Sequence, residues 1–425
     1  MPLPDQGARA GAAVVNPGRT RRRPARHRAW SVLVGCCLLY AAAVGVIGNT
    51  AGVYLVPVTE DPGWPLSALN RYLSLAAAAM TLSLPLAERV LRGPRMHLVL
   101  AAVLTVACGT YAVSATFTSL TQWYVAGVVL GVCFAHLFYL PVPLLVRAWF
   151  TRRTGFALGA ALACGSVVAA VANPVASALV EAWGWQQTRA IMGAVAWVLA
   201  VPAVLLLVRR SPADLGLEPY GGPAPAEAPP PADAQPGPVA ARRRVPSIAV
   251  VGLMSGLLVV GSSMLQQIPS AAAASGSGLQ AGAWGVSAVM VGGVLGKLGL
   301  GALRDRWGAA AATGACGLLG ALGPALVLIG GSDLRVFLAG CLLLGLGYAG
   351  LTVVPPLAVA VVVPAERFSR SYGRVTVVLA AGSVVAPVLY GTLIGTDAGA
   401  PWAWVVCLAC FAAVLGLSVV LRRPR

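Results

Sequence analysis

The chain has 425 residues, of which 58% are hydrophobic and only 10% are charged, and its mean hydropathy is +0.81. The apolar residues fall in runs of about 20, the length that an α-helix needs to cross a bilayer, so a soluble globular protein is excluded. A formal charge of +17 would suit a nucleic-acid-binding protein. However, most arginines stand between the apolar runs, where they set membrane topology, and we expect no nucleic-acid partner.

The N-terminal tail, residues 1–29, is polar and rich in arginine, and we predict that it is disordered and cytoplasmic. The apolar stretch from Trp30 to Val56 follows a basic run, as in an export signal, but it is too long for a signal core. It is therefore a retained first span. The apolar pattern predicts twelve spans, at residues 30–56, 67–87, 97–116, 122–146, 156–180, 190–208, 248–270, 283–303, 309–330, 336–363, 375–395 and 401–421.

Arginines are distributed unequally over the connections between these spans. The side of the two termini carries most of them, whereas the opposite side has only Arg71, Arg189 and Arg335. By the positive-inside rule, both termini are predicted to lie in the cytoplasm, with the chain crossing the cell membrane many times.

The longest connection, residues 209–247, divides the spans six plus six. Its prolines stand among alanines and predict an extended or disordered cytoplasmic linker rather than a folded domain. We therefore predict an all-α membrane protein with one six-helix bundle at 30–208 and a second at 248–425. Two related bundles are typical of transporters with a substrate site between the repeats.

All nine cysteines lie inside predicted spans, which leaves no loop pair for a disulfide. Cys407 and Cys410 have the spacing of a metal-binding pair, but no second pair and no nearby histidine accompanies them. We expect neither a metal site nor a cofactor.

The stretch at residues 292–308 organises the predictions about function. It contains Lys297, the only lysine of the chain, and ends in a charged turn at residues 304–308. Asp305 and Arg306 must lie at a membrane surface because charge is costly in lipid. Lys297 precedes Asp305 by eight residues and so lies about 12 Å deeper on the same helix. A cation at that depth should face a wet cavity, unless it extends along its stem to the surface.

The pattern Gly301-x-Leu303-x-Asp305-Arg306-x-Gly308 resembles the loop signature of the major facilitator superfamily of transporters. Further segments resemble the oxalate/formate-antiporter and monocarboxylate-carrier branch of that superfamily, namely Trp149–Gly159, Ser211–Gly221, Gly296–Gly301 and Arg367–Arg374. The resemblance implies two bundles of six helices, the major facilitator fold. It also implies transport of a small organic anion by alternating access, with Lys297 engaging the substrate carboxylate.

The sequence departs from the pattern of that branch at two places. The copy of the loop signature in the first half has Glu88 in place of the usual aspartate, followed by Arg89, and Leu84 stands where a glycine is usual. No lysine occurs in the first span or in the middle of the eleventh, where some members of the branch carry a second cation. A monocarboxylate is therefore favoured over a dicarboxylate.

Other candidates for substrate contact are polar residues within the spans. His136, near the middle of the fourth span, either titrates during a proton-coupled cycle, bonds to substrate, or joins two helices. The uncharged candidates, each of which can equally bond between helices, are Asn49, Tyr139, Gln266 and Gln267. Arg71, in the first turns of the second span, faces the cavity or extends outward. No acidic residue lies deep in any span, so carboxylate-based proton coupling has no candidate.

Asp305, Arg306, Glu88 and Arg89 are predicted to act as a gate. Charge pairs at the cytoplasmic ends of helices can hold the two bundles together when the cavity faces outward. The alternative is that these residues only set topology, but acidic residues contribute little to topology, which favours a gate role for Asp305.

The function predicted from these observations is secondary transport of a monocarboxylate-like anion by a monomer in lipid, with a coupling proton or counter-substrate left open. An exporter of amphipathic or drug-like compounds is the first alternative. A polytopic membrane enzyme is disfavoured because no catalytic motif occurs, and a receptor is disfavoured because the linker is too rich in proline for a folded domain.

Overall fold

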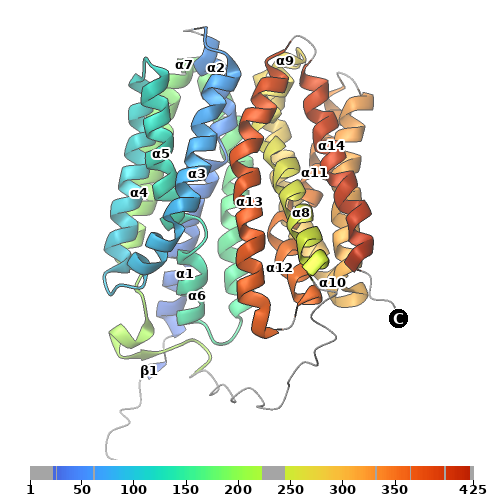
Figure 1. Ribbon diagram of the computed structural model, residues 1–425. Coiled ribbons are helices and arrows are strands. Elements are labelled where there is room, and N and C mark those ends of the chain that lie inside the picture. Colours follow the sequence, from blue (N-terminus) through green and yellow to red (C-terminus); the bar gives the residue numbers. More distant parts are fainter. Residues whose placement is uncertain are drawn as a thin grey trace, which may run out of the picture.

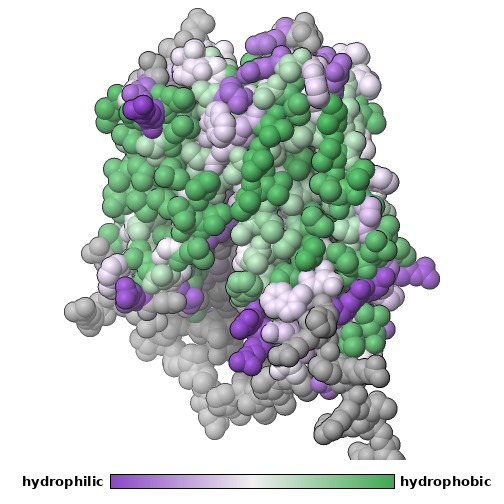
Figure 2. Space-filling model, turned by 180° about the vertical axis from the view of Figure 1, so that it is seen from behind, coloured by the Kyte–Doolittle hydropathy of each residue, from purple (hydrophilic) through white to green (hydrophobic). Residues whose placement is uncertain are grey.

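The computed structural model describes residues 23–24, 26–60, 63–222, 245–330, 333–363, 365–396 and 399–421. Long helices stand side by side, and both ends of the described chain lie at one end of the molecule (Figure 1). We call this end the terminal end. The opposite end, where α2 (Leu55–Glu60) and α9 (Ile268–Ala274) lie, is the distal end. Hydrophobic side chains form a broad band between more hydrophilic ones at the two ends (Figure 2), as a bilayer requires.

The chain crosses this band twelve times, as predicted. Eleven helical segments of the described residues are long and apolar enough to span a membrane. One of them, Phe156–Leu207, has 52 residues, which is about 78 Å of helix against a hydrocarbon core of about 30 Å. Gly184 divides it with φ 81° and ψ 162°, a conformation that glycine adopts readily. This segment therefore contains two crossings.

The first six crossings form the first bundle and the last six form the second. The helices of the first bundle are α1 (Arg26–Tyr40), η1 (Ala41–Gly48), η2 (Ala51–Tyr54), α2, α3 (Leu66–Leu91), α4 (Met96–Val113), η3 (Ser114–Thr116), α5 (Leu120–Leu137), α6 (Pro141–Trp149) and α7 (Thr154–Leu207). Those of the second are α8 (Val245–Ser262), η6 (Ser263–Gln267), α9, α10 (Leu279–Gly330), α11 (Leu334–Tyr348), α12 (Gly350–Val362), α13 (Ala365–Ile394), α14 (Gly399–Leu417) and η7 (Ser418–Leu421). Gly308, with φ 84°, divides α10 into two crossings.

Each bundle has its own packed interior. The first is built around residues such as Trp123 and Tyr111, and the second around Tyr390 and Phe411. Lipid is as apolar as these side chains, so close packing rather than water exclusion holds membrane helices together. Glycines provide that closeness: a Cβ at Gly292 would overlap the backbone of α11.

Four crossings are interrupted near the middle, where the sequence predicted continuous spans. The first contains the π-helix η1 and the 3₁₀-helix η2, and the seventh contains the 3₁₀-helix η6. The fourth breaks between α5 and α6, and the tenth breaks between α11 and α12. Pro141 begins α6, and it cannot donate a backbone hydrogen bond to the preceding turn. The same two crossings are affected in each half, which supports the six-plus-six repeat.

Part of the predicted disordered tail and linker is ordered. Strand β1 (Arg23–Pro24) pairs in parallel with β2 (Leu217–Glu218), which follows the 3₁₀-helix η4 (Pro212–Leu215). The amide of Tyr220 donates to the carbonyl of Trp149 at 2.8 Å, and the Tyr220 ring packs 5.6 Å from that of Trp30. These contacts fix the start of the linker to the first bundle. Residues 1–22 and 223–244 lie outside the described residues.

Candidate functional site

The two bundles are joined by hydrogen bonds in the distal half. Asn70 lies in the second turn of α3 from its distal start, and Gln267 precedes α9. Within the described residues, the hydrogen bonds between the bundles join Asn49 Nδ2 to Met290 Sδ at 3.7 Å, Gln267 Nε2 to Asn70 Oδ1 at 2.7 Å, and Ser287 Oγ to the carbonyl of Ala170 at 2.6 Å. All of these groups are uncharged.

Close backbone packing accompanies these bonds. Gly52, in η2, lies against Gln266, and a Cβ at Gly52 would overlap the Gln266 carbonyl oxygen. Gly391 of α13 lies against the side chain of Asn70, with an added Cβ 2.5 Å from Asn70 Nδ2. The distal end is therefore closed by contacts of the first crossing with the seventh and eighth, of the second with the seventh and eleventh, and of the fifth with the eighth.

Among the described residues, the terminal half of the space between the bundles is open. Viewed from behind, the surface between the bundles is continuous above and hollowed below, toward the terminal end (Figure 2). Tyr139, at the break between α5 and α6, is 56% exposed, although its electrostatic neighbours Tyr348 and Tyr372 belong to the second bundle. A side chain that faces the opposite bundle and is still half exposed lines a cavity. The described residues therefore leave this space open at the terminal end and close it at the distal end.

Lys297 points into the space between the bundles. Ala283, Ser287, Met290, Val294 and Lys297 follow one another at intervals of four and three residues, so they share one face of α10. Ala283 packs into the core of the first bundle, and Ser287 and Met290 bond to it. Lys297 lies seven residues beyond Met290, about 10 Å nearer the terminal end, where the bundles have separated.

The side of α10 that faces lipid differs from the side that carries Lys297. Its strongly exposed apolar residues are Trp284, Val291, Leu295 and Leu298. Lys297 is half-buried. Gly293, one turn earlier on the same side of α10, lies close to Tyr348, since a Cβ added at Gly293 would be 3.4 Å from the Tyr348 ring. The helix face of Lys297 is thus directed toward the first bundle and the tenth crossing rather than toward lipid, and its role in substrate binding stays a prediction.

Tyrosines from both bundles surround the same cavity. The phenol of Tyr139 lies within electrostatic range of Tyr40 in the first crossing, Tyr348 in the tenth and Tyr372 in the eleventh. Hydroxyl groups both donate and accept hydrogen bonds, and the rings offer apolar faces. Tyr139 was a sequence candidate, whereas the other three were missed because a single tyrosine in an apolar span has no distinguishing pattern.

Lys297 has no ionic partner among the described side chains. The ion pair that these side chains form joins Glu88 and Arg92, within α3. Lys297 also has no hydrogen bond to another described residue, so the cavity contains a cation whose charge no described group neutralises. An unpaired cation at membrane depth is costly unless water or a ligand reaches it.

The other residues predicted to contact substrate lie in different parts of the structure. Gln267 and Asn49 bond between the bundles at the distal closure, and Gln266 lies against Gly52 there. His136 is buried, with Nδ1 2.9 Å from the carbonyl of Val132 on its own helix. Arg71 is exposed near the distal start of α3. A substrate role for these residues stays a prediction.

The predicted gate residues lie at the terminal end. Glu88 pairs with Arg92 of its own helix, and Arg89 and Arg306 are exposed. The side chain of Asp305 lies outside the described residues. Because the terminal end is open here, pairs that close it are not expected in this conformation, and the gate assignment stays a prediction.

Two distal residues were missed by the sequence analysis. Asn70 carries the amide that bonds to Gln267. A single asparagine in an apolar span forms no pattern from which this contact could be predicted. Arg189 was predicted in a loop between 180 and 190, but helix α7 turns at Gly184 and continues, so Arg189 lies inside the sixth crossing with only 1% of its surface exposed. The Trp183-Gly184-Trp185 sequence was the available signal for so short a turn.

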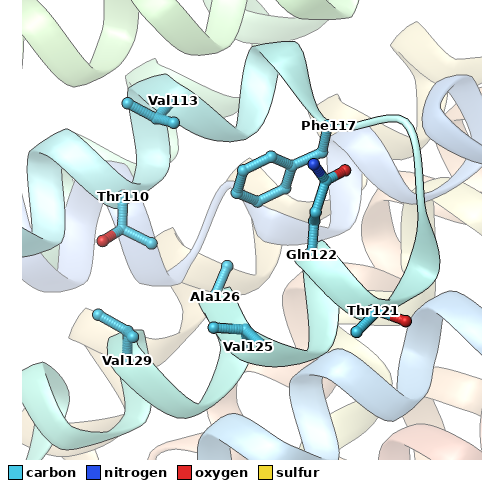
Figure 3. Close-up of a pocket in the computed structure, with 8 residues that line it drawn as sticks. All are labelled: Thr110, Val113, Phe117, Thr121, Gln122, Val125, Ala126 and Val129. Atoms are coloured by element: carbon cyan, nitrogen blue, oxygen red, sulfur yellow. The ribbon is translucent and has the colours of Figure 1, made fainter.

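A separate pocket of about 400 Å³ lies on the outer surface of the first bundle (Figure 3). Its lining comes from α4, α5 and their connection, and includes Val113, Phe117 and Val125. Val113 and Val125 are more than half exposed. This pocket is apolar and far from the second bundle, so it faces lipid and does not belong to the central cavity.

Comparisons with known proteins agree with this architecture. The structure resembles that of the nucleoside transporter NupG, with a TM-score of 0.70 and 14% identity, over 93% of this chain and 98% of that one. It also resembles a bacterial homologue of the human lysosomal transporter Spinster, described as inward-facing and unoccupied, with a TM-score of 0.64 and 14% identity, over 93% and 95% of the two chains.

At such low identity, these likenesses establish the fold alone. A search of curated proteins found no match. The sequence itself matches the Major Facilitator Superfamily over residues 36–283, more than half of the chain. With two six-helix bundles closed at one end and open at the other, this chain belongs to the major facilitator superfamily, whose members carry small molecules across membranes by alternating access.

Proposed function

We propose that the protein transports a small organic anion of the monocarboxylate type. The observation that carries this proposal is Lys297, a cation that faces the cavity and has no acidic or hydrogen-bonding partner among the described side chains. A carboxylate would supply the missing negative charge. A single cation suits a single carboxylate better than two, because a second carboxylate would enter the cavity without a described counter-charge.

The tyrosines around Tyr139 support the same substrate class. Their hydroxyls can donate to the carboxylate oxygen that Lys297 does not reach, and their rings can pack against the organic part of the anion. Charge-assisted hydrogen bonds of this kind are stronger than those between neutral groups. Binding to a wet, open cavity would exchange the hydration of Lys297 for these contacts.

A transporter of amphipathic compounds is the second candidate, since four tyrosines also suit a large apolar ligand. In that case Lys297 would remain hydrated during binding, and the charge of the ligand would matter little. The similarity to a protein named as a nucleoside transporter adds nucleosides to the compounds worth testing.

The test is ligand-induced thermal stabilisation of the purified protein, with monocarboxylates, dicarboxylates, the corresponding neutral amides, nucleosides and amphipathic dyes as ligands. A monocarboxylate at ten times its Kd should stabilise the wild type by about 1.4 kcal/mol, and its amide should not. Lys297→Ala should remove this response, whereas Lys297→Arg should keep part of it because the guanidinium differs in geometry from an ammonium.

The matched control is Arg335→Ala, which removes an exposed cation at the distal end and should leave the response intact. The organic-anion proposal is wrong if no carboxylate stabilises the wild type, or if Lys297→Ala responds equally well. Stabilisation of both proteins by the dyes alone would favour the amphipathic-compound transporter.

A further inference from the structure

Arg189 is a buried cation enclosed by aromatic rings. Its guanidinium carbon lies 4.1 Å from the ring centroid of Tyr111, 4.9 Å from that of Tyr54 and 5.0 Å from that of Trp123. Its Nε donates to Ser114 Oγ at 2.7 Å. Arg189 comes from the sixth crossing, and its partners come from the first, third and fourth crossings and the turn after the third. One side chain therefore links four parts of the first bundle, and we call this group the Arg189 cage.

The cage holds its charge without an acid. No carboxylate among the described residues pairs with Arg189, and its Nη2 has no hydrogen-bond acceptor there. The hydroxyl of Tyr54 and the indole nitrogen of Trp123 are likewise buried without a partner. The electron-rich ring faces attract the cation, but the arrangement still carries the cost of burying a charge and three incompletely bonded groups.

An apolar side chain would avoid that cost. Replacing buried charges by well-packed apolar groups is often neutral or stabilising in proteins. Bundle stability alone therefore gives a poor account of an arginine at this position. What distinguishes the cage is its location beside the irregular segment of the first crossing, residues 49–54.

Hydrogen bonds and packing connect the cage to the distal closure. The Tyr111 hydroxyl lies 2.9 Å from Thr50 Oγ1, and Tyr54 is the last residue of η2. Between these two attachment points lies Gly52, which packs against the backbone of Gln266 in the second bundle. Asn49, next to Thr50, reaches Met290 of the second bundle. Both ends of the segment that closes the distal side are thus held by partners of Arg189.

Regular helical hydrogen bonding does not fix this segment. It lies between the π-helix η1 and the α-helix α2, with Asn49 and Thr50 in a turn and residues 51–54 in a 3₁₀-helix. Such interruptions are characteristic of hinges. A segment without its own continuous ladder of hydrogen bonds depends on side-chain contacts for its shape.

We propose that Arg189 is a positioning residue for the distal gate. By stacking on Tyr54 and Tyr111, it holds residues 49–54 in the shape that presents Gly52 and Asn49 to the second bundle. Loss of the guanidinium leaves the bundle folded but lets this segment relax, and the distal end then opens more often. The proposal does not depend on the identity of the substrate.

The experiment measures the distance between the two bundles at the distal end. Spin labels are placed at Glu181→Cys and Ser277→Cys, two exposed positions, in a full-length chain from which the nine native cysteines have been removed. Double electron–electron resonance then gives the populations with short and long separation. In Arg189→Met the ratio of long to short separations should rise about thirtyfold, the effect of losing one desolvated cation–π contact.

Two milder variants separate the contribution of the Arg189 guanidinium from that of the Tyr111 hydroxyl. Arg189→Lys keeps the charge but lacks the planar group that stacks and donates to Ser114 together, so the rise should be intermediate. Tyr111→Phe keeps the ring and loses only the bond to Thr50, so it should produce a smaller shift in the same direction. Arg335→Met, an exposed arginine at the same end, is the control and should leave the distribution unchanged.

Thermal unfolding of each labelled variant separates gating from stability. If Arg189→Met lowers the unfolding temperature without changing the distance distribution, Arg189 is merely a structural residue and the proposal fails. A shift toward the short separation would also overturn it, because the cage would then oppose closure.

Discussion

The two ends of the space between the bundles are built differently. The distal end is closed by glycine packing and by uncharged hydrogen bonds such as Asn70 to Gln267. The terminal half is open and contains Lys297 and a group of tyrosines. The charged Lys297 thus lies in the half of this space that water can enter. The half that closes contains neutral groups, so closing and opening it does not bury an unpaired charge.

The difference also indicates how easily the closure can reverse. Hydrogen bonds between membrane helices average about 0.6 kcal/mol, so the three distal bonds together contribute about 2 kcal/mol. That corresponds to about a thirtyfold population ratio. A substrate with modestly different affinity for the two states can reverse a ratio of this size, whereas a closure made of buried ion pairs would resist it.

The largest expected effect comes from a wedge at the distal end. Gly52→Leu places a side chain where even a Cβ overlaps Gln266, so the distal end should be unable to close and proteoliposome uptake should fall to background. Gly109→Leu is the matched control because an added Cβ there meets no atom within 4 Å. Normal uptake by correctly inserted Gly52→Leu would show that this contact is not needed for the cycle.

A smaller effect is expected from the amide pair. Asn70→Leu leaves the amide of Gln267, a residue with no exposed surface, without its partner, and should weaken the closed state by about 1 to 2 kcal/mol. The spin-label pair at residues 181 and 277 should show more of the long separation. Ser287→Ala should change the distribution less, because the hydroxyl also bonds within its own helix. Equal populations in wild type and Asn70→Leu would contradict a role for this bond in closure.

The smallest effect is expected in the open cavity. Tyr139→Phe removes one hydroxyl from a half-exposed side chain, so the KM for substrate should rise a few-fold, the effect of about 1 kcal/mol, while the unfolding temperature stays unchanged. Tyr111→Phe, in the closed interior, is the contrast, since its hydroxyl bonds to buried Thr50 and its loss should lower stability. A stability loss in Tyr139→Phe with no change in KM would place Tyr139 among the structural residues.

Sequence reasoning found the architecture because hydrophobic length and arginine spacing are local signals. It also singled out Lys297, since one cation in an apolar helix is informative by its depth alone; its role at the cavity stays a prediction. It did not find the breaks in the fourth and tenth crossings, because prolines such as Pro141 are tolerated within membrane helices and do not by themselves mark a break.

The distal contacts were out of reach for a different reason. Asn70 and Gln267 are 197 residues apart in the chain, and no local pattern encodes which asparagine meets which glutamine. Arg189 was taken for a loop residue because a turn reduced to Gly184 is shorter than the spacing rules anticipate. Its three aromatic partners come from other crossings, so the cage becomes visible only in the folded chain.

The solitary lysine has a practical consequence for chemistry on this protein. Because Lys297 is the only lysine in the sequence, the chain has a single side-chain amine, and the helix face that carries it is directed toward the space between the bundles. Acylating reagents that react with amines but not with arginine can therefore modify one side chain of this kind, that of Lys297. The extent of its modification, read from one peptide by mass spectrometry, would report cavity access and its blockage by a bound compound without any engineered label.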